Sequence, residues 1–266
     1  MLKFKMYFMG LLSLLLNNKM VKVRRKNIFY LLKLKDYVSL KIFLTGTLEK
    51  NDSVFTFNLL KEGDVAIDIG ANIGYYTLNF SKILKNSGKV FAFEANKLNY
   101  HILSINAIQN NFNNIQIHNK IISNTRNYFK ENLINNDSGL TYYTKDSNEF
   151  ESSKGVLLDD YLDDISKINK RVRILKIDVE GAEYLILKSA EKLLDSNFAP
   201  EYILIELYQD YLKRFDSSIE DVISFLKGKD YLGPYVVKNS SLVELNIVTG
   251  LESIDGNFFF IKNIKS

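Results

Sequence analysis

The feature that most constrains the fold is an alternation, beginning at Val65, between short apolar runs and segments with helical spacing. The runs are rich in Ile, Val and Phe and lack strict polar alternation, as expected for parallel strands covered on both faces. The predicted strands are Val65–Ile69, Val90–Phe93, Ile115–Ile122, Ile174–Ile177 and Tyr202–Leu207.

Helical segments separate these runs. The spacing of apolar residues predicts helices over Tyr75–Lys85, Lys97–Asn110 and Gly181–Leu194. Strand, helix and strand repeated in this way imply right-handed crossovers. The sequence therefore predicts an α/β fold with a doubly wound sheet.

The C-terminal part has a different pattern. Ser217 and Glu220 predict a capping box at the start of a helix that ends near Gly228. The runs "YLGPYVV", "SLVELN" and "NFFFIKN" follow, and no helical segment separates the last two, so we expect a hairpin-like pair added antiparallel at the sheet edge. The polar stretch Asn124–Gly155 is weakly patterned, and we interpret it as a long functional excursion.

Residues 1–36 form a predicted helical and basic extension before a domain at 37–266. The apolar run Met6–Leu16 is too short to span a bilayer, and no small-residue cleavage site follows it. We favour a helix packed on the core. The alternative is a weak peripheral membrane contact through residues 1–26, which carry basic residues at Lys19, Lys22, Arg24, Arg25 and Lys26.

Composition narrows the chemistry. The chain of 266 residues has no cysteine, which excludes disulfides, thiolate metal sites and a cysteine nucleophile. The net charge of +4 is too small to indicate nucleic acid or an anionic membrane as a partner. We expect a cytoplasmic protein.

The segment "DVAIDIGANIGYYT" at residues 64–77 places two glycines four residues apart, directly after the first predicted strand. It lacks the three glycines of a dinucleotide-binding loop. Asp68 precedes Gly70, where its negative charge would repel a pyrophosphate. The same carboxylate suits the ammonium of S-adenosylmethionine, and Gly70 and Gly74 allow close backbone approach and tight helix entry. Glu94, at the end of the second strand, is placed to accept both ribose hydroxyls.

A second motif, "KIDVEGAE" at residues 176–183, lies at the carboxyl end of the fourth predicted strand, where ligands bind in open α/β sheets. Lys176 and Asp178 point to the same face. We expect Asp178 beside the transferred methyl group, with Glu180 orienting or deprotonating an acceptor hydroxyl. The alternative is a structural Lys176–Asp178 ion pair. For Glu183 we favour a helix start.

These motifs resemble those of the FkbM-type methyltransferases. The matching segments are "GDVAIDIGANIGYYT", "VFAFEAN", "NKIIS", "LLDDYL", "ILKIDVEGAEYLILKSA" and "ILIEL", and "LTGTLE" fits the family's lead-in. The similarity runs from about Tyr37 to the C-terminus. The family usually has Pro where this chain has Ala95, and the first 35 residues match no pattern of the family.

The resemblance implies a class I, S-adenosylmethionine-dependent O-methyltransferase of glycans or secondary metabolites, with a mostly parallel seven-stranded sheet and an antiparallel C-terminal strand. It assigns the methionine end of the cofactor to the loop of Asp68, Gly70, Ala71, Asn72 and Gly74. It assigns the ribose and adenine to Glu94, Ala95, Ile122 and Ser123. The predicted catalytic residues are Asp178, Glu180 and Lys176.

Other residues have weaker signals. Glu206 ends the fifth strand and is placed to reach the acceptor, as are Asp159 and Asp160 unless they begin a helix. His101 and His118 lack a partner motif, so we expect structural roles, and we predict no metal. We expect the acceptor pocket to be shaped by Asn124–Gly155 and Leu207–Phe215, and one of Tyr142 and Tyr143 to face it.

The acceptor is expected to be a sugar or small-molecule hydroxyl and not nucleic acid. A nucleic-acid methyltransferase, a non-catalytic cofactor-binding protein and a nicotinamide oxidoreductase are the alternatives. The motif Asn/Asp-Pro-Pro-Tyr of exocyclic-amine methyltransferases is absent from the sequence.

Overall fold

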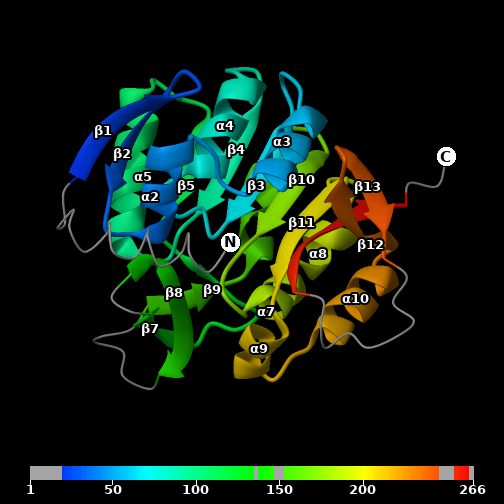
Figure 1. Cartoon of the computed structure of the whole chain (residues 1–266). Coiled ribbons are helices and arrows are strands. Elements are labelled where there is room, and N and C mark those ends of the chain that lie inside the picture. The colour runs from blue at the N-terminus through cyan, green and yellow to red at the C-terminus, as the bar shows by residue number, and fades with distance from the viewer. Residues whose placement is uncertain (1–19, 135–136, 147–152, 246–254, 264–266) are drawn as a thin grey trace.

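The computed structural model describes residues 20–134, 137–146, 153–245 and 255–263. A mixed sheet of eight strands runs through its centre (Figure 1). In spatial order the strands are β13 (Ser241–Glu244), β12 (Tyr231–Lys238), β14 (Gly256–Lys262), β11 (Tyr202–Leu207), β10 (Val172–Ile177), β3 (Val65–Ile69), β4 (Lys89–Phe93) and β5 (Ile115–His118).

The five strands from β11 to β5 are parallel, which confirms the doubly wound α/β fold. Alternate residues of β3 point to opposite faces: Val65, Ile67 and Ile69 join one hydrophobic core and Ala66 joins the other. Because both faces are covered, the strand reads as one continuous apolar run.

Helices cover the two faces. One face carries α2 (Tyr37–Thr45), α3 (Lys50–Leu59), α4 (Tyr75–Leu84) and α5 (Lys97–Gln109). The other carries the short helices η1 (Leu158–Tyr161), α6 (Leu162–Ser166), α7 (Glu183–Lys188), α8 (Glu191–Asp195), α9 (Gln209–Leu212), η2 (Lys213–Phe215) and α10 (Ile219–Gly228).

The C-terminal strands differ from the expected edge pair and from the expected count of seven. β14 lies between β11 and β12 and is antiparallel to both, while β13 forms a hairpin with β12 and becomes the edge strand. The run Phe258–Phe260 of β14 is buried, as expected for a strand inside a sheet that is covered on both faces. The capping box before α10 is formed by Ser218 and Asp221, one residue later than predicted.

The segment predicted as a helix over Gly181–Leu194 is two helices, α7 and α8. The break falls at Ser189, whose Oγ donates to the carbonyl of Ile186 (2.7 Å) and accepts from the backbone N–H of Leu158 (3.2 Å). The predicted strand Ile115–Ile122 likewise divides into β5 and β6 (Ile121–Ile122).

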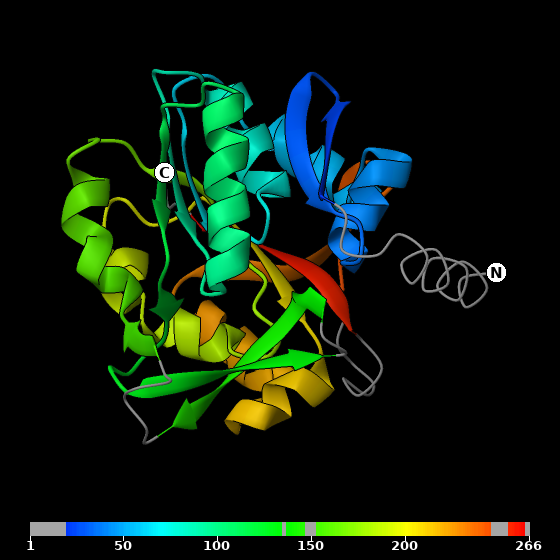
Figure 2. The same ribbon diagram turned by 90° about the vertical axis from the view of Figure 1, so that its left-hand side faces the viewer.

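The excursion Asn124–Gly155 is more ordered than its polar composition predicts. It contains β7 (Tyr128–Ile134), β8 (Asp137–Asp146) and β9 (Ser153–Val156), which join β6 in a second sheet of order β6-β9-β7-β8. In Figures 1 and 2, the antiparallel pair β7 and β8 lies near the carboxyl ends of the parallel strands.

Before α2 the chain forms a β-hairpin of β1 (Met20–Arg25) and β2 (Ile28–Lys33), which corrects the helical interpretation for these residues. The inward-facing Ile28, Tyr30 and Leu32 are buried in the same core as α5. The run Met6–Leu16 and Lys19 lie outside the described residues, and the division at residue 37 stays a prediction.

Candidate active site

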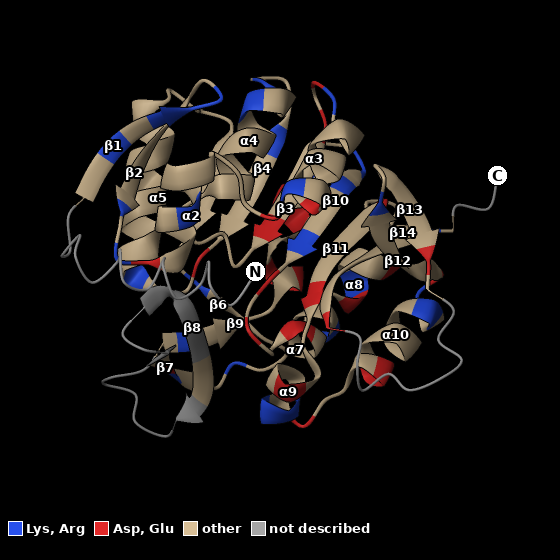
Figure 3. Cartoon of the chain, in the orientation of Figure 1, with Lys and Arg blue, Asp and Glu red and all other residues tan. Residues whose placement is uncertain are grey.

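A cavity of about 370 Å³ opens at the carboxyl ends of β3, β4, β10 and β11. Acidic residues gather in this region of the molecule (Figure 3). Its lining includes all the predicted site residues except Gly74, namely Asp68, Gly70, Ala71, Asn72, Glu94, Ala95, Ile122, Ser123, Lys176, Asp178 and Glu180. Two sequence motifs more than 100 residues apart therefore meet at one site.

The loop after β3 needs glycine at position 70. Gly70 has a φ of +79°, and a Cβ there would lie 1.8 Å from the carbonyl oxygen of Asp178. The loop is tied to the next strand, because the backbone N–H groups of Gly70 and Ala71 both donate to the carbonyl of Phe93 (3.0 Å). Close packing of this loop against the end of β10 is what joins the two motifs.

Gly74 has a structural role instead. It precedes α4 with a φ of +98°, and a Cβ would lie 2.4 Å from Cδ1 of Leu103 on α5. The glycine thus lets α4 and α5 pack closely, while the residues before it face the cavity.

Asp68 is buried, with a side chain that faces α4. Its Oδ2 accepts from the hydroxyl of Thr77 (2.6 Å), and its Oδ1 has no hydrogen-bond partner among the described residues. Burial raises the pKa of Asp68, and the nearby Lys176 opposes that shift. A buried oxygen without a partner costs stability unless a ligand donates to it.

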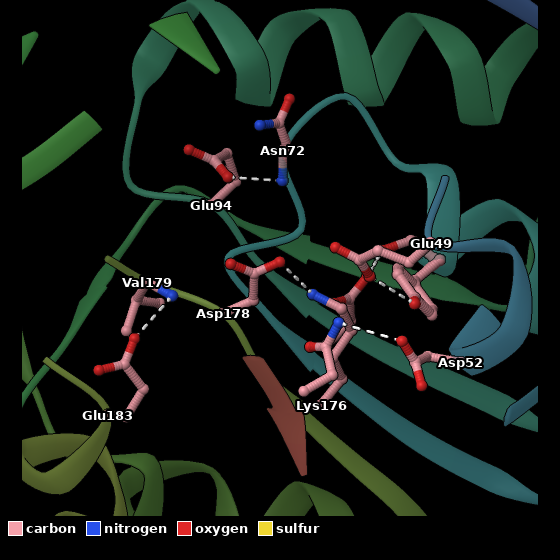
Figure 4. A network of polar contacts seen from close by, with 12 residues as sticks. Glu49, Asp52, Asn72, Glu94, Lys176, Asp178, Val179 and Glu183 are labelled. Carbon is pink, nitrogen blue, oxygen red and sulfur yellow. Dashed lines mark hydrogen bonds and ion pairs between the residues drawn. The ribbon is translucent and has the colours of Figure 1, made fainter. Parts of the chain in front are cut away.

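Glu94 is held rigidly at the end of β4. Its Oε2 accepts from the backbone N–H of Asn72 (2.6 Å; Figure 4). Its Oε1 accepts from the backbone N–H of Asn96 (2.8 Å). Burial raises the pKa of Glu94 to about 7, although both hydrogen bonds favour the ionised form. Each carboxylate oxygen keeps a second lone pair, so Glu94 can still accept from a ligand.

Ile122 ends β6 and Ser123 follows it, and both line the cavity. The Oγ of Ser123 is buried and has no hydrogen-bond partner in the described part of the chain. Its backbone N–H donates to the carbonyl of Val156 (2.9 Å), which fixes the residue against β9.

Lys176, Asp178 and Glu206 form a chain of polar contacts across the ends of β10 and β11. The buried Nζ of Lys176 lies 2.8 Å from Oδ2 of Asp178 (Figure 4). Burial acts to raise the pKa of Asp178, but Lys176 and a hydrogen bond from Glu206 hold it below its ordinary value. Burial and then the charge of Asp178 raise the pKa of Glu206, so its carboxyl group keeps its proton and donates a hydrogen bond to the Asp178 carboxylate. The ion pair that we gave as the structural alternative is thus formed, and it lines the cavity.

Glu180 lies at a sharp turn after β10, with a φ of +60°. Burial and then the charge of Asp178 raise the pKa of Glu180 to about 7. Its Oε2 is buried without a hydrogen-bond partner among the described residues. The pKa of Glu180 therefore lies near neutral pH, as does that of Glu94.

Glu183 begins α7 and is not among the residues that line the cavity. Its Oε1 accepts from the backbone N–H groups of Gly181 (3.0 Å) and Val179 (3.4 Å), so it fixes the turn that carries Glu180. Asp159 likewise accepts from the backbone N–H groups of Lys192 and Leu193 (2.9 Å each) at the start of α8, and Asp160 pairs with Arg126 (2.6 Å). Both are outside the lining.

The histidines are also outside it. His118 stacks on Phe93 with ring centroids 4.9 Å apart, and His101 is exposed on α5. In the described ranges, no group of three or more His, Asp or Glu side chains is arranged to hold a metal ion.

The sequence matches the FkbM methyltransferase domain over residues 68–232, which is more than half of the chain. The chain belongs to the FkbM methyltransferase family. Its methyl donor is accordingly S-adenosylmethionine. No curated protein sequence matches the chain.

Solved structures share the fold of this FkbM protein. An FkbM methyltransferase of Methylobacillus flagellatus aligns with a TM-score of 0.50 at 17% identity, over 83% of this chain and 52% of that one. An O-methyltransferase of Thermotoga maritima aligns with a TM-score of 0.46 at 15% identity, over 92% of this chain and 78% of that one. An rRNA methylase of Streptococcus thermophilus aligns with a TM-score of 0.44 at 14% identity, over 79% of this chain and 91% of that one.

Sequence reasoning missed residues that lie outside the FkbM match or between the motifs. Glu49, from the lead-in "LTGTLE", lines the cavity and accepts from the hydroxyl of Tyr76 (2.8 Å). Burial and then the charge of Asp178 raise its pKa. Asn257 of β14 also lines the cavity, and its Nδ2 lies 3.4 Å from Oδ2 of Asp52. A lone acidic or amide residue far from the glycine loop has no local pattern that marks it.

Within the described residues, none of the helices of this FkbM protein has the length and apolar character needed to cross a membrane.

Proposed function

We propose that the protein transfers a methyl group from S-adenosylmethionine to a hydroxyl of a glycan or another polyhydroxylated small molecule. The observation that carries this proposal is one cavity with two kinds of lining. One end has buried polar atoms, at Asp68 and Ser123, that lack a hydrogen-bond partner within the described part of the chain, and the other has a linked set of carboxyl groups.

The first end fits the cofactor. Oδ1 of Asp68 would accept from its ammonium, Glu94 from its ribose hydroxyls, and the hydroxyl of Ser123 would meet the adenine. Each of these residues is already positioned by a contact: Asp68 through Oδ2 to Thr77, Glu94 through Oε2 to Asn72, and Ser123 through its backbone N–H to Val156. When bound there, S-adenosylmethionine supplies a methyl group on a positively charged sulfur.

The second end suits an acceptor that is rich in hydroxyl groups. Asp178, Glu206 and Glu49 provide hydrogen-bond acceptors and a donor, and the cation Lys176 is already paired. Tyr208 and Phe215 add apolar surface to the same lining. Such a mixture of carboxyl and aromatic groups recognises sugar-like rings.

Glu180 is the proposed base. Its pKa of about 7 matches the requirement that a general base be partly ionised at the working pH. As the acceptor oxygen gains the methyl group, its proton passes to the Glu180 carboxylate. Lys176 keeps Asp178 ionised, and the Asp178 carboxylate would stabilise the positively charged sulfur of the bound cofactor.

RNA is the second candidate acceptor, since an rRNA methylase shares the fold. The lining argues against it, because binding a phosphate backbone requires several lysine or arginine contacts and the acceptor end is dominated by carboxyl groups. A steep dependence of RNA affinity on salt would favour RNA instead.

The first test is calorimetric binding of S-adenosylhomocysteine to the wild type and to Glu94→Ala. We expect binding that is weakened by about 1–3 kcal/mol in the variant, because the ribose loses its acceptor. A folded wild type that does not bind would overturn the methyltransferase proposal.

The second test measures incorporation of labelled methyl from S-adenosylmethionine into a panel of polysaccharides, glycosides and RNA. Methylation of a hydroxyl gives an ether, which is stable to base, whereas an ester is not. Label that stays in the carbohydrate after alkali treatment therefore supports hydroxyl methylation. Label found only in RNA would contradict it.

A further inference from the structure

The β7–β8 hairpin contributes two aromatic side chains to the cavity, Phe129 and Tyr143. They belong to the sheet of order β6-β9-β7-β8, whose strand β6 leads into Ser123. Burial first, and then the charges of Glu131 and Glu94, raise the pKa of Tyr143, so its phenol group lies near Glu94. The excursion thus reaches the cofactor end of the cavity, whereas the sequence predicted a role at the acceptor end.

The hairpin is anchored at its base. Tyr128 and Phe129 pair with Lys154 and Ser153 of β9, and β9 pairs with β6, which leads directly into Ser123. Phe129 is buried, and a Cβ at Gly155 would lie 2.8 Å from its ring. The position of the Phe129 ring relative to the ends of the parallel strands is therefore fixed.

A second anchor lies further along the hairpin. Glu131 of β7 is directly opposite Tyr143 of β8, and the Tyr143 hydroxyl lies 3.4 Å from Oε1 of Glu131. The same oxygen accepts a hydrogen bond from Nδ2 of Asn96, the residue that caps α5. Since Asn96 also donates its backbone N–H to Glu94, one short path links the hairpin to the predicted ribose-binding carboxylate.

β8 also contacts both α2 and α5. These helices supply the cavity with Tyr37, Val38 and Lys41 on one side and Asn99 on the other. The hairpin accordingly spans the cavity between two walls, and Figure 2 shows β7 and β8 lying across the region below the strand ends.

We propose that the β7–β8 hairpin covers the adenosine part of S-adenosylmethionine, with Tyr143 in direct contact and Glu131 as a positioning residue that holds Tyr143 to Asn96. This inference rests on the proposed cofactor site and adds residues that neither motif contains. An aromatic ring over the purine or the ribose contributes apolar contact that the polar groups of Glu94 and Ser123 do not provide.

The test compares two ligands by calorimetry: S-adenosylhomocysteine and 5′-methylthioadenosine, which has the adenosine part without the amino acid. Tyr143→Ala is expected to weaken the binding of both by about tenfold. Tyr143→Phe retains the ring but loses the hydroxyl that meets Glu131, so it should lose only about threefold. Glu131→Ala should also lose about threefold, and Glu131→Gln, which keeps an acceptor for Asn96 and for the Tyr143 hydroxyl, should recover most of it.

Two controls separate contact from folding. Thr144→Val alters the next residue of β8, whose hydroxyl meets Asn132 (3.0 Å), and should leave both affinities unchanged. Asp68→Asn should weaken only S-adenosylhomocysteine, because methylthioadenosine lacks the ammonium.

Equal affinity of Tyr143→Ala and wild type for both ligands would overturn the inference, as would an equal loss in Thr144→Val. A loss confined to S-adenosylhomocysteine would place Tyr143 at the amino-acid end and overturn it too. If the folded wild type binds neither ligand, the proposed function itself fails.

Discussion

Gly70 shows how one missing side chain can join two distant motifs. The carbonyl oxygen of Asp178 occupies the space where a Cβ would be, so the loop after β3 and the end of β10 are in direct backbone contact. The positions of the cavity-lining residues at the ends of β3 and β10 depend on this close backbone contact.

We therefore expect Gly70→Ala to abolish S-adenosylhomocysteine binding and to lower the melting temperature, because the clash at 1.8 Å and the positive φ both force the loop away from β10. Gly228→Ala is the matched control. At that position, at the end of α10, no atom of the described residues lies within 4 Å of a Cβ, and the variant should be more stable by about 0.4–1 kcal/mol. Normal binding by Gly70→Ala would show that the contact is dispensable.

Glu180 gives a prediction about pH. If its carboxylate is the base, the acceptor kcat/KM should rise with pH up to about 7 and then level off, because only the ionised form takes the proton. Glu180→Gln should remove that limb and lower the rate by about 10²–10⁴-fold while S-adenosylhomocysteine still binds. An unchanged profile in Glu180→Gln would assign the proton to another group.

At the scale of elements, the β1–β2 hairpin is attached by asparagine side chains rather than by a third strand. Asn106 of α5 accepts from the backbone N–H of Leu31 (2.6 Å) and donates to the carbonyl of Ile73 (2.9 Å). Asn110 accepts a hydrogen bond from the backbone N–H of Phe29 and donates one to the carbonyl of the same residue. One buried side chain thus connects the hairpin to the loop that follows Asn72.

Asn106→Ala should destabilise the protein by about 2–4 kcal/mol in urea unfolding, because it removes hydrogen bonds to the part-buried N–H of Leu31 and the buried carbonyl of Ile73. The neighbouring Ile105 is 46% exposed, and Ile105→Ala should change the free energy of unfolding by less than about 0.5 kcal/mol. Equal effects of the two changes would mean that the asparagine bonds contribute little.

Elements with a strong local signal were predictable from sequence, and those fixed by distant contacts were not. The buried parallel strands β3 and β11 match their predicted bounds, since continuous apolar runs mark them. Ser189 breaks the predicted helix through a bond to Leu158, which no local pattern reveals. The position of β14 depends on pairing with β11, about 50 residues earlier.

The candidate site shows the same division. Asp68, Glu94 and Asp178 end strands whose order follows from the fold, so their convergence could be expected. Glu49 and Tyr143 reach the cavity from a helix–helix connection and an inserted hairpin. Their placement depends on tertiary packing against Tyr76 and Asn96.

At the scale of the whole molecule, buried carboxyl groups link stability to pH. Burial raises the pKa of Glu183 from 4.5 to about 7, so the folded state binds this proton more tightly than the unfolded chain. The corresponding stabilisation is complete below about pH 4.5 and is lost as the pH rises through 7.

In the absence of ligand, the melting temperature should fall between about pH 5 and pH 8, and Glu183→Gln should reduce that slope. Differential scanning calorimetry across this range is the measurement. Glu220→Gln, on α10, is the control and should keep the wild-type slope. A steeper fall in Glu183→Gln would reverse the assigned sign.

The insertion of β14 between β11 and β12 has a consequence for synthesis on the ribosome. β11, α10 and β12 emerge first, yet the place between the two strands stays open until residues 256–262 arrive. A nascent chain that pauses before Gly256 exposes two unpaired strand edges, the kind of surface that chaperones shield and that otherwise aggregates. The segment that defines the family, residues 68–232, is thus shorter than the unit that must be translated before the sheet can close.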